Sequence, residues 1–163
     1  MDRYTLHVRL THGCNADCSY CSSLTADPAR HMSLDDFHQS CLFIANELLP
    51  LLGHKERSGH ISIQYVGGEI LTVPAALLEA QVRAARDVFS RIFASLRDGA
   101  QSNLIGSSSR VRRLHDLFEG RIGTSIDNFT NQRTVQGSAA TYRKLTGRRI
   151  DEIKSDLGRP PSG

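Results

Sequence analysis

The sequence has few cysteines and no long hydrophobic runs. Only four of its 163 residues are cysteine, and its longest apolar stretches, Leu48–Leu52 and Ile61–Val66, are interrupted by proline or by polar residues. Neither approaches the ~20 apolar residues of a membrane-spanning helix. Met1–Tyr4 leads directly into a strand-like segment, which is not the pattern of a signal peptide. We therefore expect a cytoplasmic protein with no membrane partner.

Charge of one sign is also scarce. Twenty Lys and Arg residues against 17 Asp and Glu give a net charge of only +3, spread along the chain. Nucleic-acid-binding proteins usually show a clustered basic face, so we expect no nucleic-acid partner. The length and the 39% apolar content predict one domain over residues 1–157. The tail Gly158–Gly163 is expected to be flexible.

Strand-like and helix-like patterns alternate along this domain. Strands are expected at Thr5–Leu10, Ile61–Val66, Gln101–Ile105 and Ile122–Ile126. Helices are expected at Leu34–Pro50 after an N-cap at Ser33, at Pro74–Arg97, from Ser107 to Phe118, and from about Ser138. The alternation predicts an α/β fold with a parallel sheet and about four βα units. Four strands cannot close a barrel, so the expected fold is an open, partial (β/α) barrel.

Three of the cysteines lie close together after the first expected strand. Cys14, Cys18 and Cys21 fall within eight residues, and three neighbouring thiols in a reducing compartment indicate a metal or cluster site. Three thiolates on one loop can bind one face of a four-iron cluster. One iron then has no protein ligand, and an open iron is where a substrate or cofactor can coordinate.

A structural zinc site is the alternative for these thiols, and it needs a fourth ligand. Cys41, His12 and His31 are the candidates. Cys41 shares the apolar face of its expected helix with Phe37 and Ile44, which favours a place in the core. The two histidines flank the cysteine loop, and we expect them to lie at the surface. A zinc-binding structural module nevertheless remains open at this point.

The cysteine spacing resembles the signature of a known superfamily. Cys14-x3-Cys18-x2-Cys21, with Tyr20 before the third cysteine, is similar to the motif of radical S-adenosylmethionine (SAM) enzymes. Further segments follow in the order typical of the sulfatase-maturase and peptide-modifying (SPASM-type) branch. They are Gly67-Gly68-Glu69, Gln101-Ser102-Asn103, Ser125-Ile126-Asp127, and Arg133 followed by Gly137-Ser138.

Each of these segments also has a simpler interpretation. Gly67–Glu69 alone would be a glycine turn with a solvated carboxylate, and Arg133 alone an exposed loop arginine. As a site, the glycines would let the backbone approach a ligand and the carboxylate could hold an ammonium group. All the segments follow expected parallel strands, and their carboxyl ends form the edge where α/β barrels place active sites.

The resemblance implies a [4Fe–4S] cluster on Cys14, Cys18 and Cys21 and a SAM molecule on the open iron. The cofactor-binding residues it implies are Tyr20, Gly67, Gly68, Glu69, Asn103, Ser125, Asp127 and Arg133. Gly67–Glu69 would contact the amino group, Tyr20 the adenine region, and Ser125 with Arg133 the ribose and carboxylate side. No residue is assigned as a catalytic acid or base.

The implied activity is that of an oxidoreductase-type radical enzyme. Reductive cleavage of SAM gives a 5′-deoxyadenosyl radical, which takes a hydrogen atom from a peptide or protein substrate. An electron donor such as flavodoxin or ferredoxin is expected. The extension with auxiliary clusters and the last two barrel units of the branch have no counterpart here. We therefore expect a second chain or a further C-terminal segment to complete the barrel, with a non-catalytic cluster- or SAM-binding remnant as the alternative.

Overall fold

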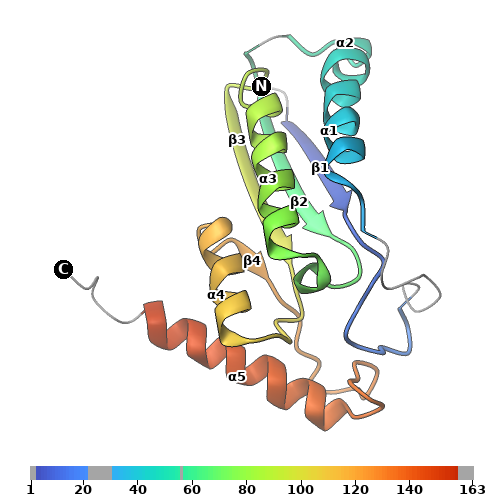
Figure 1. Cartoon of the computed structure of the whole chain (residues 1–163), viewed down its shortest axis with the longest axis vertical. Coiled ribbons are helices and arrows are strands. Elements are labelled where there is room, and N and C mark those ends of the chain that lie inside the picture. The colour runs from blue at the N-terminus through green and yellow to red at the C-terminus, as the bar shows by residue number, and fades with distance from the viewer. Residues whose placement is uncertain (1–2, 22–30, 56, 158–163) are drawn as a thin grey trace.

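Four parallel strands form one sheet in the computed structural model, which describes residues 3–21, 31–55 and 57–157 (Figure 1). The strands are β1 (Arg3–Arg9), β2 (His60–Val66), β3 (Ser95–Gln101) and β4 (Ile122–Gly123). Their order across the sheet is β1-β2-β3-β4, and each pairs with the next in parallel. The predicted α/β fold with an open parallel sheet is therefore confirmed. Residues 22–30, which include the end of the loop expected over Thr11–Ala26, and the expected tail (158–163) lie outside the described residues.

Helices connect the strands. They are α1 (Leu34–Phe43), the π-helical η2 (Ile44–Leu48), α2 (Leu49–Leu51), the 3-10 turn η3 (Ile70–Thr72), α3 (Ala75–Phe89), α4 (Ser108–Leu117) and α5 (Ala139–Leu157). Serine caps set two of the starts, as predicted. Ser33 accepts a hydrogen bond from the Asp36 amide at 3.0 Å, and Ser107 accepts one from the Arg110 amide at 3.3 Å.

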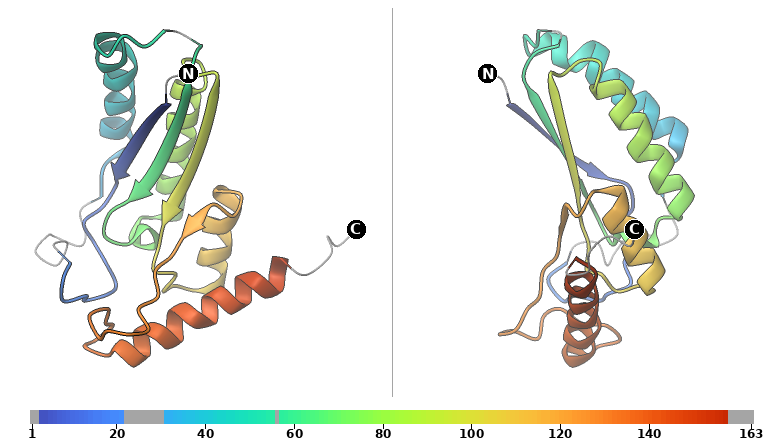
Figure 2. Two further views of the ribbon diagram at one scale, coloured as in Figure 1. Left: turned by 180° about the vertical axis from the view of Figure 1, so that it is seen from behind. Right: turned by 90° about the vertical axis from the view of Figure 1, so that its left-hand side faces the viewer.

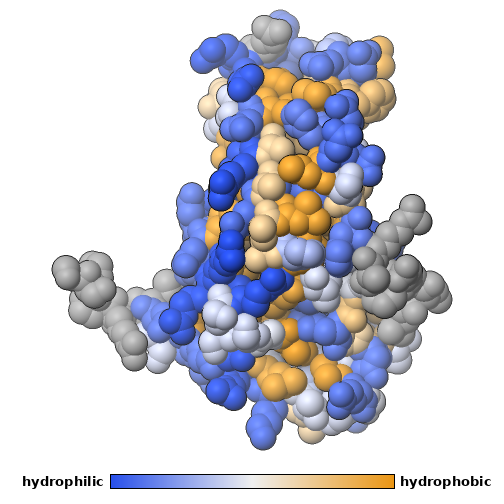
Figure 3. Space-filling model, in the orientation of Figure 1, coloured by the Kyte–Doolittle hydropathy of each residue, from blue (hydrophilic) through white to orange (hydrophobic). Residues whose placement is uncertain are grey.

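One face of the sheet packs against α1 and α3, and the hydrophobic core lies between them (Figure 2). Alternate residues of each strand point into it because successive side chains of a strand face opposite sides. The fully buried side chains of β2 are Ile61, Ile63 and Tyr65. Cys41 on α1 also lies in this core, and burial raises its pKa to about 11, so its predicted packing role is confirmed. On the solvent-facing side of the helical layer, apolar side chains lie between hydrophilic ones (Figure 3).

The predicted helix from Pro74 to Arg97 is confirmed as far as Phe89 and is wrong in its last third. α3 ends at Phe89, and β3 begins at Ser95. Val88, Ile92 and Leu96 follow one another at a spacing of four, which imitates a continuing helix. The alternation of β3 was concealed because its central inward position is an aspartate.

That aspartate, Asp98, is 1% exposed and is neutralised by two arginines. Arg86 on α3 binds its carboxylate at 2.6 and 3.1 Å, and Arg121 binds it at 3.3 Å. A buried charge is tolerated when it is paired and hydrogen-bonded in this way. Tertiary pairing therefore made a strand out of a segment whose local pattern favoured a helix.

Two further boundaries differ from the predictions. The third strand ends at Gln101, where it was expected to begin, so Ser102–Ile105 is loop. Leu104 in that loop has a positive φ of 61°, which is incompatible with a strand. The fourth strand is only Ile122–Gly123, shorter than the expected Ile122–Ile126. Among the described residues, no helix is both long and apolar enough to cross a membrane.

Candidate functional site

A cavity of about 240 Å³ opens at the carboxyl ends of the strands. Ten of the eleven residues singled out in the sequence line it, and Asp127 is the exception. The lining comprises Cys14, Ala16, Cys18, Tyr20, Cys21, Val66, Gly67, Gly68, Glu69, Gln101, Ser102, Asn103, Ser125, Arg133 and Tyr142. Its size is near the lower end of small-molecule sites, which start at ~300 Å³. Segments more than a hundred residues apart in the chain therefore meet at one place.

The base of the cysteine loop is docked against the end of β2 through backbone contacts. The Gly68 amide donates to the Thr11 carbonyl at 3.0 Å, and the Glu69 amide donates to the Gly13 carbonyl at 2.7 Å. A Cβ atom on Gly68 would overlap the Gly13 carbonyl, and one on Gly67, where φ is +142°, would lie 2.6 Å from the Thr11 oxygen. The glycine pair is thus required for contact with the loop, whereas the sequence suggested a close approach to a ligand.

The carboxylate of Glu69 joins the ends of β2 and β3. The side chain is 1% exposed. Its Oε1 accepts from the Ser102 hydroxyl at 2.6 Å and from the Leu71 amide at 3.0 Å, and its Oε2 accepts from the Asn103 amide at 2.6 Å. Burial raises the pKa of Glu69, and these three hydrogen bonds partly offset that rise. Glu69 is therefore a buried anchor and not the solvated carboxylate of a simple turn.

Asn103 ties the cysteine loop to the end of β3. Its Nδ2 donates to Asn15 Oδ1 at 2.7 Å, while Asn15 Nδ2 donates to the Ile105 carbonyl at 2.5 Å. Asn103 Oδ1 in turn accepts from the Ile105 amide at 2.8 Å. The loop that carries the thiols is thereby held from a second side.

The segment before α5 clamps the same loop from a third side. The amides of Asp17 and Ser19 donate to the carbonyls of Thr134 and Gln132, both at 2.9 Å. The Thr134 hydroxyl donates to the Asp17 carbonyl at 2.8 Å, and the Gly137 amide donates to the Asp17 carboxylate at 2.8 Å. The Thr134 hydroxyl and then the Gly137 amide lower the pKa of the Asp17 carboxyl. These hydrogen bonds also bring Arg133 to the mouth of the cavity.

Two tyrosines flank Arg133. Its guanidinium lies 5.4 Å from the centre of the Tyr20 ring, within cation–π range. Tyr142 on α5 is fully buried beside Ala16 and Cys18, and its hydroxyl donates to the Ser125 carbonyl at 3.1 Å. Burial raises the pKa of Tyr142, and the neighbouring Arg133 partly offsets this. The sequence reasoning missed Tyr142, although a lone aromatic four residues after Ser138 marks the inward face of a polar helix.

The three loop thiols belong to a small apolar cluster that also contains Ala16 and Tyr142. They differ in how far they are exposed to solvent. Cys18 is buried, and Cys14 and Cys21 are half-buried. Burial raises the pKa of Cys14, although the Ala16 amide donates to its sulfur at 3.4 Å and opposes that shift. Over the described ranges, no three His, Cys, Asp or Glu side chains form a group that could hold one metal ion.

Asp127 lies apart from the other predicted residues. Its carboxylate accepts hydrogen bonds from the amides of Phe129 and Thr130, at 3.2 and 2.8 Å, and from the Thr130 hydroxyl. These bonds lower its pKa. The structure therefore gives Asp127 a loop-forming role and does not bring it into the cavity.

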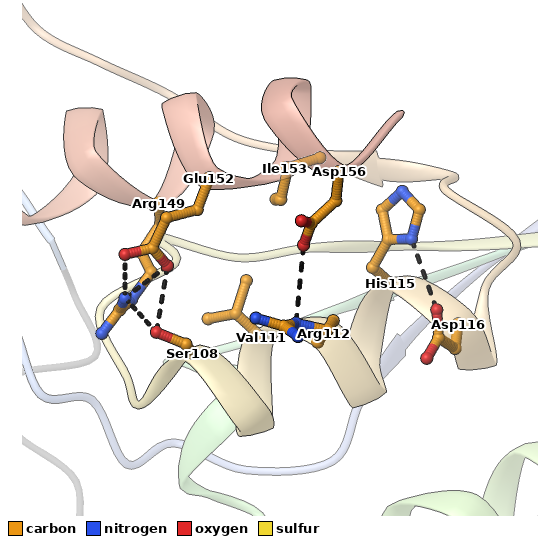
Figure 4. Close-up of a pocket in the computed structure, with 9 residues that line it drawn as sticks. All are labelled: Ser108, Val111, Arg112, His115, Asp116, Arg149, Glu152, Ile153 and Asp156. Atoms are coloured by element: carbon orange, nitrogen blue, oxygen red, sulfur yellow. Dashed lines mark hydrogen bonds and ion pairs between the residues drawn. The ribbon is translucent and has the colours of Figure 1, made fainter. Parts of the chain in front are cut away.

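A second hollow lies between α4 and α5 and contains none of the predicted residues (Figure 4). Its charged side chains are paired with one another. Arg149 binds Glu152 at 2.5 Å, and Arg112 binds Asp156 at 3.5 Å. The charged side chains of this hollow therefore bind mainly one another.

No protein-family profile and no curated protein matches the chain. Solved structures do match. A structure of histidine-tagged anSMEcpe with bound AdoMet has a TM-score of 0.65 at 19% identity and covers 94% of this chain but 42% of its own. "Native anSMEcpe with bound AdoMet" gives 0.62 at 15% identity, with the same coverage. "Native anSMEcpe with bound AdoMet and Cp18Cys peptide" gives 0.63 at 17% identity, with 94% and 41% covered.

These neighbours are structures of an anaerobic sulfatase-maturating enzyme of the radical SAM/SPASM class. The resemblance read from the sequence is thus confirmed at the level of the fold, over nearly the whole chain. The chain spans less than half the length of the enzyme it matches.

Proposed function

We propose that this chain is a radical SAM protein whose cavity binds a [4Fe–4S] cluster and SAM. One observation carries the proposal. The three thiols, the Gly67–Glu69 turn, the end of β3 and the segment around Arg133 line a single cavity at the carboxyl edge of the sheet. The likeness to structures described with bound AdoMet supports the same reading.

The donor set suits these groups, although no three side chains of the described residues converge on one metal ion. A four-iron cluster does not require that convergence, because each thiolate would bind a different iron. Cys14, Cys18 and Cys21 supply three thiolate ligands on one loop, and all three line the cavity. When bound and reduced, the cluster would supply one electron to the sulfonium of SAM, giving methionine and a 5′-deoxyadenosyl radical. The protein's contribution is position and exclusion of water.

Each wall of the cavity has its own task in this proposal. Tyr20, 53% exposed and stacked by Arg133, offers a flat surface to the adenine region. Ser125 and Arg133 face the ribose and carboxylate side, and Tyr142 holds Ser125 through its carbonyl. Glu69 has three protein donors already, so it contributes by fixing the ends of β2 and β3. The proposed ammonium contact then falls to the backbone of Gly67–Glu69.

A peptide or protein is the proposed substrate. Neighbouring structures are described with bound AdoMet and a peptide, either Cp18Cys or Kp18Cys. We further propose a flavodoxin or ferredoxin as electron donor, and a second chain or a further segment that closes the barrel over the cavity.

Anaerobic reconstitution tests the proposal. The protein is supplied with iron and sulfide, then with SAM and a strong reductant, and 5′-deoxyadenosine is quantified. Product and a four-iron cluster are expected in the wild type and should be lost in Cys18→Ala. Cys41→Ala is the matched control, because this buried thiol lies in the core and should leave iron content and product unchanged.

The other outcomes separate the alternatives. A four-iron cluster that binds SAM without yielding product would indicate a non-catalytic remnant or a missing segment. Zinc bound in place of iron, and lost in Cys18→Ala, would overturn the proposal in favour of a structural zinc module.

A further inference from the structure

The two ends of the cysteine loop meet at a narrow base. The chain leaves β1 through Leu10–Thr11 and returns through His31–Met32 to the start of α1. The Met32 amide donates to the Leu10 carbonyl at 2.8 Å, and Thr11 forms an antiparallel bridge with His31. These four residues are called the neck below. All three thiols lie in the loop that the neck closes, so the neck sets where this loop begins and ends.

The β2–α3 unit holds both halves of the neck. On the outgoing half, the Gly68 amide donates to the Thr11 carbonyl at 3.0 Å. On the returning half, Gln81 of α3 donates from its Nε2 to the Met32 carbonyl at 2.7 Å. The first contact is made by the backbone and the second by a side chain. The second contact can therefore be removed by a substitution that leaves the backbone of both segments unchanged.

Gln81 is an unusual residue for its place in the core. It is 0% exposed and lies on the inward face of α3, whose other buried residues are all apolar. They are Leu78, Val82, Ala85 and Phe89. The Met32 carbonyl requires a donor, so the Gln81 Nε2 faces it and the Oε1 points elsewhere. Among the described residues, this buried Oε1 has no hydrogen-bond partner.

The stability of the core does not account for this choice of residue. A buried carbonyl without a partner costs its full desolvation, whereas a hydrogen bond to a neutral carbonyl contributes only modestly. An unbranched apolar side chain of the same length would therefore serve the core at least as well as Gln81. Buried polar atoms that lack partners call for an explanation, and functional sites are where such local costs are retained.

We infer that Gln81 is a positioning residue for the proposed cluster, because its amide fixes the neck and thereby the loop that presents the three thiols. This inference rests on the proposed function and adds a residue outside the cavity to it. A loop with both ends fixed has fewer conformations to lose when it binds, so its ligands hold a cluster more tightly.

The competing explanation is that Gln81 anchors the start of α1. Met32 directly precedes Ser33, the N-cap of that helix, and α1 packs in the core with α3. In that case, removal of the amide should destabilise the whole fold. If Gln81 instead positions the neck, its removal should loosen the neck and leave the stability of the fold unchanged.

Gln81→Met tests the inference, because it keeps the length of the side chain and removes both amide groups. In the metal-free full chain, the urea midpoint should equal or exceed that of the wild type. Exchange of the Met32 amide, measured by NMR relative to core amides of β2, should be about fivefold faster, the equivalent of one lost hydrogen bond. In the reconstituted chain, iron should be lost to a chelator about fivefold faster.

Two variants are matched controls. Val82→Ala changes the neighbour of Gln81, which is equally buried, and should lower the urea midpoint without changing the relative exchange of Met32. Gln39→Met makes the same replacement on the exposed face of α1 and should change none of the three measurements. Gln81→Leu repeats the test with a second apolar side chain.

A urea midpoint of Gln81→Met and Gln81→Leu as low as that of Val82→Ala would assign Gln81 to the stability of the core and overturn the inference. Exchange of Met32 at the wild-type rate would also overturn it. A cluster that binds and is lost at the wild-type rate from Gln81→Met refutes the inference alone, and the proposed function stands. Faster exchange of Met32 in a chain that binds no cluster supports the hold of Gln81 on the neck and refutes the radical function.

Discussion

Two walls of the cavity are built in different ways. The wall formed by Gly67–Glu69 is backed by Thr11–Gly13 and is held by backbone hydrogen bonds, by two glycines in close contact and by a buried carboxylate. The wall formed by residues 125–137 is largely exposed, including a fully exposed Phe129. The first wall is continuous with the core, while the second is connected to the sheet by a two-residue strand, β4, and by a hydrogen bond from the Gln101 side chain to the Ser125 hydroxyl at 3.3 Å.

The difference implies an order of dependence. Residues 132–137 are positioned by hydrogen bonds to Asp17 and Ser19, which belong to the cysteine loop. That loop is in turn positioned by the first wall. Damage to the first wall should therefore disturb both walls, whereas damage to the second should leave the first intact. Local stability differs across a protein in this manner when buried contacts are unevenly distributed.

The largest effect is expected from Gly68→Ala. The new methyl would overlap the Gly13 carbonyl, and the backbone of two docked segments would have to separate. We expect a loss of about 3 kcal/mol in the free energy of unfolding, because a rigid backbone atom cannot move aside as a side chain can. Iron retention after reconstitution should also fall strongly. Urea unfolding and iron analysis measure the two effects.

Gly137→Ala is the control for this substitution. Gly137 has a φ of +73°, but nothing lies within 4 Å of an added Cβ. Only the conformational cost of a left-handed residue should appear, about 1 kcal/mol, with iron retained. An equal loss of stability in the two variants would show that the glycine contact at β2 has no special importance.

Glu69→Gln should have the next largest effect. The amide nitrogen would face one of the three donors that now bind the carboxylate, leaving a buried donor without its acceptor. We expect a loss of about 1–3 kcal/mol in the free energy of unfolding near pH 4.5. Chemical unfolding of the metal-free protein provides the measurement.

The cost of Glu69→Gln should depend on pH in a defined direction. Burial raises the pKa of Glu69 in the folded state, so the folded protein holds this proton more tightly than the unfolded chain does. The resulting stabilisation is complete below the unfolded pKa near 4.5 and is lost as the pH rises through the raised value. The wild type's advantage over Glu69→Gln should therefore shrink with rising pH. An advantage that grows with pH would show that the carboxylate is stabilised in its charged form.

The position of the site was predictable because parallel strands end at the same edge of a sheet. The cysteines, Gly67–Glu69 and Asn103 follow three such strands, so local motifs were enough to bring them together. The role of the glycine pair was not predictable, since the Gly13 carbonyl that requires it lies some 50 residues away in the sequence. A sequence pattern shows that a glycine is present but not what approaches it.

Contacts between residues far apart in the sequence limited the prediction of two other features. The start of β3 was missed because Asp98 in a core position reads as a helix surface residue, and its partners Arg86 and Arg121 are known only from the fold. Tyr142 was missed because its environment is made by the cysteine loop, far away in the chain. In both cases the contact that explains the residue joins two distant segments of the chain. Hydrophobic periodicity within one segment does not reveal such a contact.

The smallest effect on the fold is expected at the contact between the two walls. Asp17→Ala removes the acceptor of the Gly137 amide, while the backbone bonds of the first wall remain. The affinity for SAM should fall about fivefold because one hydrogen bond that positions Arg133 is lost. Hydrogen exchange should accelerate over residues 132–137 and stay unchanged over Gly67–Glu69, and iron retention should match the wild type.

Asp17→Asn distinguishes a positioning role from a purely electrostatic one. The asparagine oxygen can still accept from the Gly137 amide, so SAM affinity and exchange should return close to the wild-type values if the hydrogen bond is what matters. If Asp17→Asn behaves as Asp17→Ala does, the negative charge beside the loop is what matters. If Asp17→Ala instead speeds exchange at Gly67–Glu69, the first wall depends on the second, and the order of dependence argued above is reversed.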